Sequence, residues 1–244
     1  MKGSAAFPVR LQFTKLGRVR FISHRDVARA FERAMRVEAL PLAFTKGFVP
    51  RPRISFGHAL AVGHESVAEY LDVDLDRDVD IDGLPERLSG ALPQGIDVTG
   101  AAALAEGAPA LQESVAAMAY RVVVVSDGDR GAGGIQEALA SALTAALAAP
   151  SLVTTLQRKG REVEEDLRPM LENLEIAEGP DDPTLAMELS TRPRVVRPGE
   201  VLGALGPSFC EQRVVRTAQW IERDARLGPL EADARPCIEE MRGP

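Results

Sequence analysis

The order of the predicted helices and strands is the feature that most constrains the fold of this chain. Alternating apolar residues from Val9 to Phe13 indicate a strand, and apolar residues recur at helical spacing from Val27 to Ala34. Ser23, three residues before Asp26, has the pattern of a capping box and predicts the start of this helix. The remaining elements of this half are extended segments at 19–22 and 42–45, strands at 67–75 and 96–98, and a short helix at 84–92.

The second half of the chain repeats this order with one additional hairpin. Its elements are strands at 120–125, 151–157, 163–167, 174–177, 185–190 and 213–221, and helices at 135–148 and 198–205. The order β-α-β-β-α-β is typical of ferredoxin-like domains. We therefore predict an α+β protein made of two ferredoxin-like halves in tandem with antiparallel sheets.

The stretch from Ala101 to Ala110 is rich in Ala, Gly, Glu and Pro and marks the expected boundary between the halves. The predicted domains are residues 1–106, with a basic face, and residues 107–227. Residues 228–244 contain three prolines and little periodicity, which predicts a flexible tail.

Cysteine content and hydropathy exclude several classes of protein. Cys210 and Cys237 are 27 residues apart, so the chain has no closely spaced thiolates for an iron–sulfur cluster or a Cys-rich zinc site. No window approaches the roughly 18 consecutive apolar residues of a membrane span, and the first 20 residues lack a signal core. We expect a cytoplasmic protein with no membrane contact and no cofactor or metal in this chain.

Positive charge is concentrated between Arg10 and Arg53. This stretch holds 11 of the 29 Lys and Arg but only 3 of the 36 Asp and Glu, so it carries a formal charge of +8 within a chain of net charge −7. Such asymmetry indicates a surface for an anionic partner.

The helix in this stretch carries a row of arginines. Arg25, Arg29, Arg33 and Arg36 fall within an arc of about 80° at the 100° turn of a helical residue, opposite the apolar face. These side chains could grip phosphates. The alternative is a solvated face with internal pairs, notably between Glu32 and Arg36.

The loop that follows combines arginines with aromatic residues. Lys46, Arg51 and Arg53 offer phosphate donors, and Phe48 offers a surface for stacking with unpaired bases. The alternative is a rigid surface connection whose phenylalanines, Phe48 and Phe56, pack into the core.

Histidines supply one candidate catalytic residue. His24 lies in the first turn of the predicted helix, where it could act as a general acid or base on a phosphodiester, or serve only as a cap or packing residue. His58 and His64 could be metal ligands with Glu65 or Glu69, but nothing specifies the geometry, and we treat them as structural residues.

Two further basic segments lie in the second half. Arg158 and Lys159 are at the tip of a predicted hairpin, and Arg192, Arg194 and Arg197 precede a helix at Pro198. The predicted nucleic-acid contacts of the whole chain are Arg20, Arg25, Arg29, Arg33, Arg36, Lys46, Phe48, Arg51, Arg53, Arg158 and Lys159.

Several short runs carry a resemblance to a known family. They are FTK at 13–15, RFISHRD at 20–26, FERA at 31–34, LPL at 40–42, PRPRISFG at 50–57, ES at 65–66, EYLD at 69–72 and DLRP at 166–169. On these runs the chain resembles the radical-SAM-linked (radical-SAM-associated) family, a domain of unknown function. The resemblance implies a partner: a radical SAM protein with a cobalamin-binding-type domain.

A more distant similarity, in element order and in the histidine at the helix start, is to the CRISPR repeat-processing endoribonucleases. The glycine-rich loop that those proteins usually show near their C-terminus is missing here.

Three functional hypotheses follow. The leading one is a non-catalytic accessory protein that binds structured RNA, a tRNA or a ribosomal RNA, and presents it to a radical SAM enzyme. The second is an RNA-cleaving enzyme that uses His24, and the third is a protein-interaction module that docks on a radical SAM partner without RNA.

Overall fold

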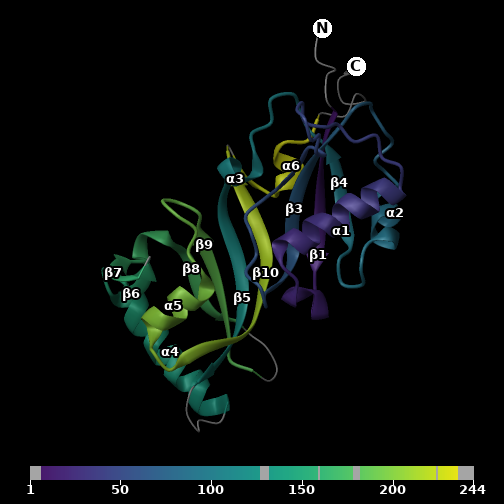
Figure 1. The fold of residues 1–244 in the computed structure, drawn as a ribbon. Helices are drawn as coiled ribbons and strands as arrows, with labels where there is room; N and C mark the ends of the chain where they lie inside the picture. Colours follow the sequence, from purple (N-terminus) through teal and green to yellow (C-terminus); the bar gives the residue numbers. More distant parts are fainter. Residues whose placement is uncertain (1–6, 127–131, 159, 178–181, 224, 236–244) are drawn as a thin grey trace, which may run out of the picture. The chain divides into compact units, whose positions relative to one another are not determined.

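The computed structural model describes residues 7–126, 132–158, 160–177, 182–223 and 225–235 (Figure 1). The chain forms two compact units. The first consists of Met1–Val115 with Gln219–Pro244, and the second of Ala116–Ala218. The first unit therefore uses both ends of the sequence, whereas we predicted a boundary at residue 106.

The first unit is built on an antiparallel sheet. Strand β1 (Phe7–Lys15) lies between β3 (Glu65–Leu75) and β4 (Val98–Ala103), and the short β2 (Ile54–Phe56) pairs with β3. Its other elements are η1 (Gly17–Phe21), α1 (His24–Val37), α2 (Leu84–Ala91), α3 (Leu111–Ser114), β11 (Arg226–Leu227) and α6 (Pro229–Ala232).

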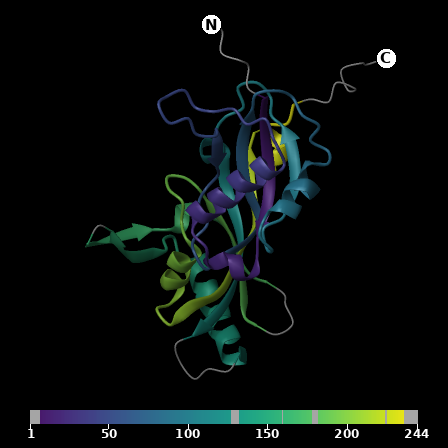
Figure 2. The same ribbon diagram turned by 45° about the vertical axis from the view of Figure 1, so that its right-hand side comes forward.

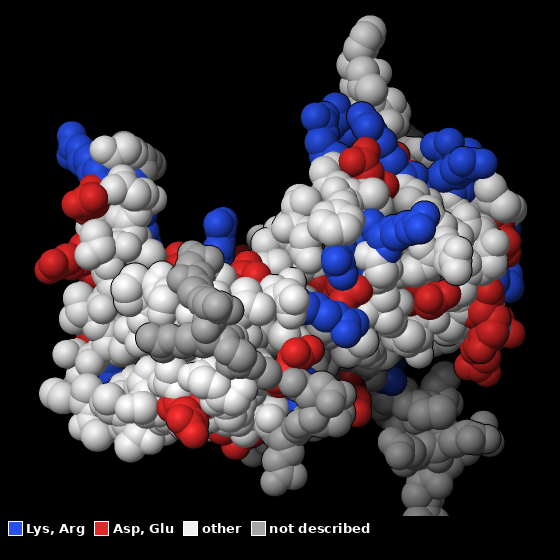
Figure 3. Space-filling view, turned by 90° about the horizontal axis from the view of Figure 1, so that it is seen from below, with Lys and Arg blue, Asp and Glu red and all other residues white. Residues whose placement is uncertain are grey.

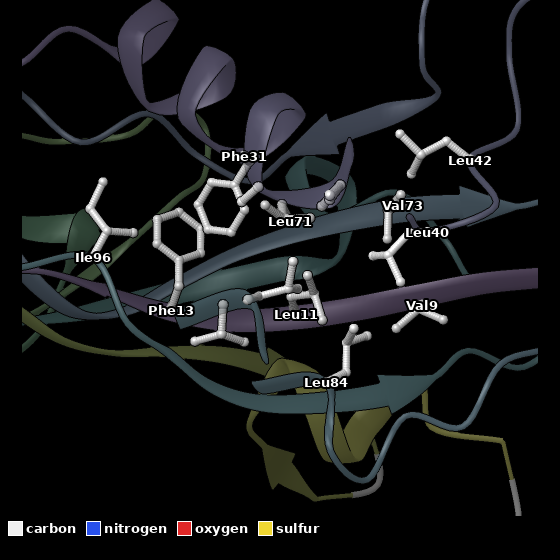
Figure 4. Packing of buried hydrophobic residues seen from close by; sticks show 14 of the residues in the cluster. Val9, Leu11, Phe13, Phe31, Leu40, Leu42, Leu71, Val73, Leu84 and Ile96 are labelled. Carbon is white, nitrogen blue, oxygen red and sulfur yellow. The ribbon is translucent and has the colours of Figure 1, made fainter. Parts of the chain in front are cut away.

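The core of this unit forms where α1 covers the sheet. The apolar face of α1 buries Phe31, which meets Phe13 of β1 at a ring separation of 4.7 Å and lies beside Leu71 of β3 (Figure 4). Leu84 and Leu88 of α2 belong to the same buried cluster. Burial of each such side chain contributes about 1.5–3 kcal/mol, so packing of α1 and α2 against the sheet holds this unit together.

The start of α1 agrees with its predicted capping box. The Ser23 side chain accepts a hydrogen bond from the backbone N–H of Asp26, and the Ser23 hydroxyl donates to the Asp26 carboxylate at 2.7 Å. Residues 17–21, which we expected to be extended in part, instead form the 3-10 helix η1. The chain turns there because Gly17 takes a left-handed φ of 68° and its N–H is held by Glu65 at 2.7 Å.

The second unit also has its first strand in the interior of the sheet. Strand β5 (Val115–Ser126) lies between β10 (Phe209–Glu222) and β9 (Thr184–Ser190), and β8 (Leu171–Ala177) flanks β9. The other elements are α4 (Ala132–Ala148), the separate hairpin of β6 (Val153–Arg158) and β7 (Arg161–Asp166), η2 (Arg168–Met170) and α5 (Pro198–Leu205). The mixed α+β class and the mostly antiparallel sheet are confirmed, whereas the ferredoxin-like description of the two halves stays a prediction.

The prediction of a flexible tail from residue 228 is wrong for its first residues. Residues Pro229–Ala232 form α6, and the Asp233 side chain is 1% exposed. The reason is Arg10, which is fully buried. It binds Asp72 at 2.7 and 2.9 Å, Asp233 at 2.7 Å and the carbonyl of Pro229 at 3.1 Å. Sequence periodicity did not reveal this anchor, because it is an electrostatic contact between residues more than 200 positions apart.

We expect Arg10→Met to lower the free energy of unfolding by about 3–5 kcal/mol, because the buried carboxylate of Asp233 and the partly buried carboxylate of Asp72 lose their shared cation. Urea denaturation measures this loss. The control is Arg77→Met at an exposed position, which should change stability by no more than about 0.5 kcal/mol. Equal denaturation midpoints for the two variants would show that the cluster does not hold the unit together.

Candidate functional site

The four predicted arginines of α1 are all exposed. Arg25, Arg29, Arg33 and Arg36 lie on the side of the helix away from the buried face, and Figure 2 shows α1 on the outside of its sheet. Over a rise of 1.5 Å per residue the row extends about 16 Å. We call these four residues the arginine row. In Figure 3, Lys and Arg side chains gather on one part of the surface, with acidic side chains among them.

Most of the arginine row has no carboxylate partner. The pair between Glu32 and Arg36 that the alternative interpretation included is not formed, and within the described residues Arg25, Arg33 and Arg36 make no ion pair. Arg29 lies 3.4 Å from Asp26, with the two side chains 70% and 52% exposed, a type of pair that contributes little in water. The row therefore keeps most of its positive charge available to an anion.

Among the residues that the structure describes, Asp26 is the acidic side chain that pairs with the row. The hydroxyl of Ser23 donates to the Asp26 carboxylate. This bond lowers the pKa of Asp26, with smaller contributions from the Ser23 backbone N–H and from Arg29. Asp26 therefore stays ionised at neutral pH and serves mainly to start the helix.

The loop between α1 and β2 presents its aromatic tip to solvent. Its base is closed by hydrogen bonds from the Thr45 N–H to the Arg51 carbonyl at 2.8 Å and from the Arg51 N–H to the Thr45 hydroxyl at 3.0 Å. Phe48 is fully exposed, and Lys46 and Arg51 are also exposed. We call residues 44–53 the tip loop.

Phe48 and Phe56, for which we considered both stacking with RNA and packing in the core, have different surroundings in the structure. Phe56 packs against the core ring of Phe13 at 6.3 Å and against the ring of His24 at 4.9 Å, so for Phe56 the packing interpretation holds. Phe48 has no such role. Arg53 is partly engaged, because its guanidinium pairs with Asp74 at 2.7 Å.

Two further predicted contacts have internal partners. Arg20 lies 3.6 Å from Glu65 and over the ring of Phe21 at 4.7 Å. In the second unit, Arg158 pairs with Glu165 at 2.7 Å, and Glu165 also binds Arg194, which lowers the pKa of Glu165. Lys159 lies outside the described residues.

His24 lines a small cavity whose wall also includes Lys15, His58, Glu69 and Tyr70. Its volume is about 20 Å³, which suits a water molecule. The Lys15 ammonium donates to the carbonyls of Arg20 and Ile22 at 3.2 Å each, and burial lowers the pKa of Lys15 although Glu69 opposes the shift. The described residues contain no group of three side chains suited to a metal ion.

Sequence reasoning did not predict that these polar side chains meet. From the sequence we considered His58 together with His64, whereas in the structure His58 lines the cavity beside His24. Lys15 lies on the same buried face of β1 as Leu11 and Phe13, four and two residues before it. A lysine that continues an apolar alternation was the sequence signal that could have indicated a buried ammonium group. Glu69 could not be placed without the pairing of β1 with β3, in which it stands opposite Phe13.

A family model described as "Uncharacterized protein conserved in bacteria (DUF2344)" matches residues 9–198. The chain belongs to this family. The match includes the arginine row, the tip loop and the cavity, and ends at the first residue of α5. A search of curated proteins found no match for the chain. No helix in the part of the chain that the structure describes has the length and apolar character needed to cross a membrane.

Solved structures that match this chain have little sequence identity to it. A chain of "Crystal Structure of a Cbf5-Nop10-Gar1 Complex" aligns over 87% of this chain with a TM-score of 0.49 and 9% identity. A chain of "Crystal structure of the archaeal box H/ACA sRNP Nop10-Cbf5 complex" aligns over 92% of this chain with a TM-score of 0.44 and 12% identity. A chain of "Structure of H/ACA RNP bound to a substrate RNA containing 2'-deoxyuridine" aligns over 93% of this chain with a TM-score of 0.45 and 9% identity. The chain covers 49% of each of these chains.

Burial in the cavity wall raises the pKa of Tyr70 to about 12, so between about pH 10 and 12 the folded state holds a proton that the unfolded state has lost. We expect tyrosinate absorbance to show a component near pH 12 that disappears in Tyr70→Phe and persists in Tyr120→Phe. The Tyr70 contribution to stability is complete below pH 10 and is lost as the pH rises to 12. An unchanged high-pH component in Tyr70→Phe would contradict the assignment.

Proposed function

We propose that this protein is an RNA-binding accessory protein of a cytoplasmic radical SAM enzyme, and that it presents a structured RNA, a tRNA or ribosomal RNA, through the arginine row and the tip loop. The observation that carries the RNA part is the arginine row itself. Four guanidinium groups are exposed along one helix face, and three of them have no carboxylate partner among the described residues.

The chemistry of these groups suits RNA. A guanidinium presents a planar set of donors that matches phosphate oxygens, and a row of them can contact several phosphates. Phe48 adds an exposed aromatic face on which an unpaired base can stack, beside Lys46 and Arg51. The combination supports RNA better than an acidic protein surface, since a protein surface does not require the aromatic tip.

The accessory role rests on the family resemblance and on cysteine content. A radical SAM enzyme holds its cluster on closely spaced thiolates, and this chain has only Cys210 and Cys237. In this proposal the radical chemistry belongs to the partner, a radical SAM protein with a cobalamin-binding-type domain. The chain contributes affinity for the RNA.

We expect Arg29→Glu with Arg33→Glu to weaken binding of a structured RNA by about tenfold or more at moderate salt, because two phosphate contacts become repulsive. The slope of log affinity against log salt should fall in magnitude by about two. Fluorescence anisotropy with labelled tRNA over a salt series measures both quantities.

The matched control is Arg77→Glu with Arg235→Glu, which makes the same change in net charge at exposed positions outside the row. This variant should retain most of the affinity. Equal losses in the two variants would show that net charge alone determines binding, and absence of RNA binding by the native chain would remove the proposal.

The partner is tested by affinity purification of the native chain from cells, with and without nuclease. Recovery of a radical SAM protein together with a specific RNA supports the accessory role. Recovery of that protein after nuclease treatment, without any affinity for RNA, would favour the protein-interaction module instead.

The cavity favours a second candidate function, RNA cleavage with His24 as a general acid or base. His24 shares the cavity with Lys15 and Glu69, two ionisable groups that could assist it. If the isolated chain cleaves RNA, His24→Ala should lower the rate by about a hundredfold or more while circular dichroism shows an unchanged fold. Failure of the native chain to cleave any cellular RNA would remove this candidate.

A further inference from the structure

A groove lies between α1 and the residues that follow α2. Its volume is about 450 Å³, within the range of about 300–1,000 Å³ typical of small-ligand sites. It is separate from the small cavity at His24, since the two share no residue. The lining residues are Asp26, Arg29, Ala30, Arg33, Ala91, Leu92 and Pro93.

The groove combines two cationic side chains, one carboxylate (Asp26) and an apolar wall. Arg29 and Arg33 stand one helical turn apart on α1, so their side chains leave the helix about 6 Å from each other along its axis. Leu92 and Pro93 contribute apolar surface from the end of α2. Arg33 has no carboxylate partner in the described part of the chain, and the exposed pair of Arg29 with Asp26 contributes little.

A ligand that fits this groove needs an anionic group beside a flat apolar one. A nucleotide has both, because its phosphate can accept from the guanidinium groups while its base lies against aliphatic side chains. An acidic peptide offers carboxylates but has no flat ring fixed next to them. A base within a duplex is stacked and paired, so it cannot enter.

Resting on the proposed function, we infer that this groove holds one unpaired nucleotide of the bound RNA, with its phosphate at Arg29 and Arg33 and its base against Leu92 and Pro93. The protein then selects RNA with a loop or bulge over continuous duplex. The proposal gives the arginine row a specificity that phosphate contacts alone cannot supply.

The test fills the groove without changing its charge. Ala30 lines the groove, whereas Ala28, also half-buried on α1, does not. Ala30→Gln and Ala28→Gln are therefore a matched pair, and Gln is a good helix former. Each variant is titrated with a hairpin RNA that carries a single-stranded loop and with a fully paired RNA duplex.

We expect the native chain and Ala28→Gln to bind the hairpin more tightly than the duplex. Ala30→Gln should bind the hairpin about tenfold more weakly and the duplex with unchanged affinity. Because the glutamine could disturb packing, a hairpin with 4-thiouridine in its loop is also photo-crosslinked to the native chain. Crosslinks to residues 29–33 or 91–93 are expected.

The outcomes separate the two proposals. If the native chain binds neither RNA, the proposed function fails and the groove assignment fails with it. If the chain binds RNA but Ala30→Gln behaves like Ala28→Gln and the crosslinks map elsewhere, only the groove assignment is overturned. Loss of a co-purified protein in Ala30→Gln, with RNA binding intact, would overturn it in favour of a protein-docking site.

Discussion

The first unit depends on one buried guanidinium. Arg10 is at the centre of the sheet on β1, binds both oxygens of Asp72 on the neighbouring β3, and reaches Asp233 beyond α6. Burial raises the pKa of Asp72, and the hydrogen bonds from Arg10 oppose that shift. The buried carboxylate of Asp233 and the partly buried carboxylate of Asp72 are tolerated because one cation bridges them, and the more exposed Arg223 also binds Asp233. The C-terminal segment is therefore joined to the sheet by this charge cluster, in addition to the packing of Leu230 against Ala68, Tyr70 and Leu111 and a backbone hydrogen bond from Ala105 to Asp233.

Local patterns were sufficient for most of the elements. Alternation identified β1 and β3, helical spacing and Ser23 identified α1, and Pro198 marked the start of α5 at the correct residue. They failed where a distant residue decides the conformation. The 3-10 helix η1 is held by Glu65 and Lys15, and α6 is held by Arg10, so neither could be predicted from its own sequence.

The candidate site shows the same division. Helical projection correctly placed the arginine row on the exposed face, because the face opposite an apolar stripe must meet solvent. Charge counting could not tell which basic residues remain available. Arg10 and Lys15 counted toward the basic stretch, yet both are buried and engaged within the protein. The groove beside Leu92 and Pro93 was not predictable, since it depends on how α1 and the end of α2 pack.

The closed base of the tip loop affects how the proposed RNA contact can be tuned. Because hydrogen bonds between Thr45 and Arg51 fix the ends of the loop, a ligand has to order only the few residues between them, and the entropy lost on binding is small. Loop tips of this kind accept substitutions and insertions without loss of the fold. In the proposed function, residues 46–50 are therefore where substitutions in this chain can change RNA affinity while the core beneath stays the same.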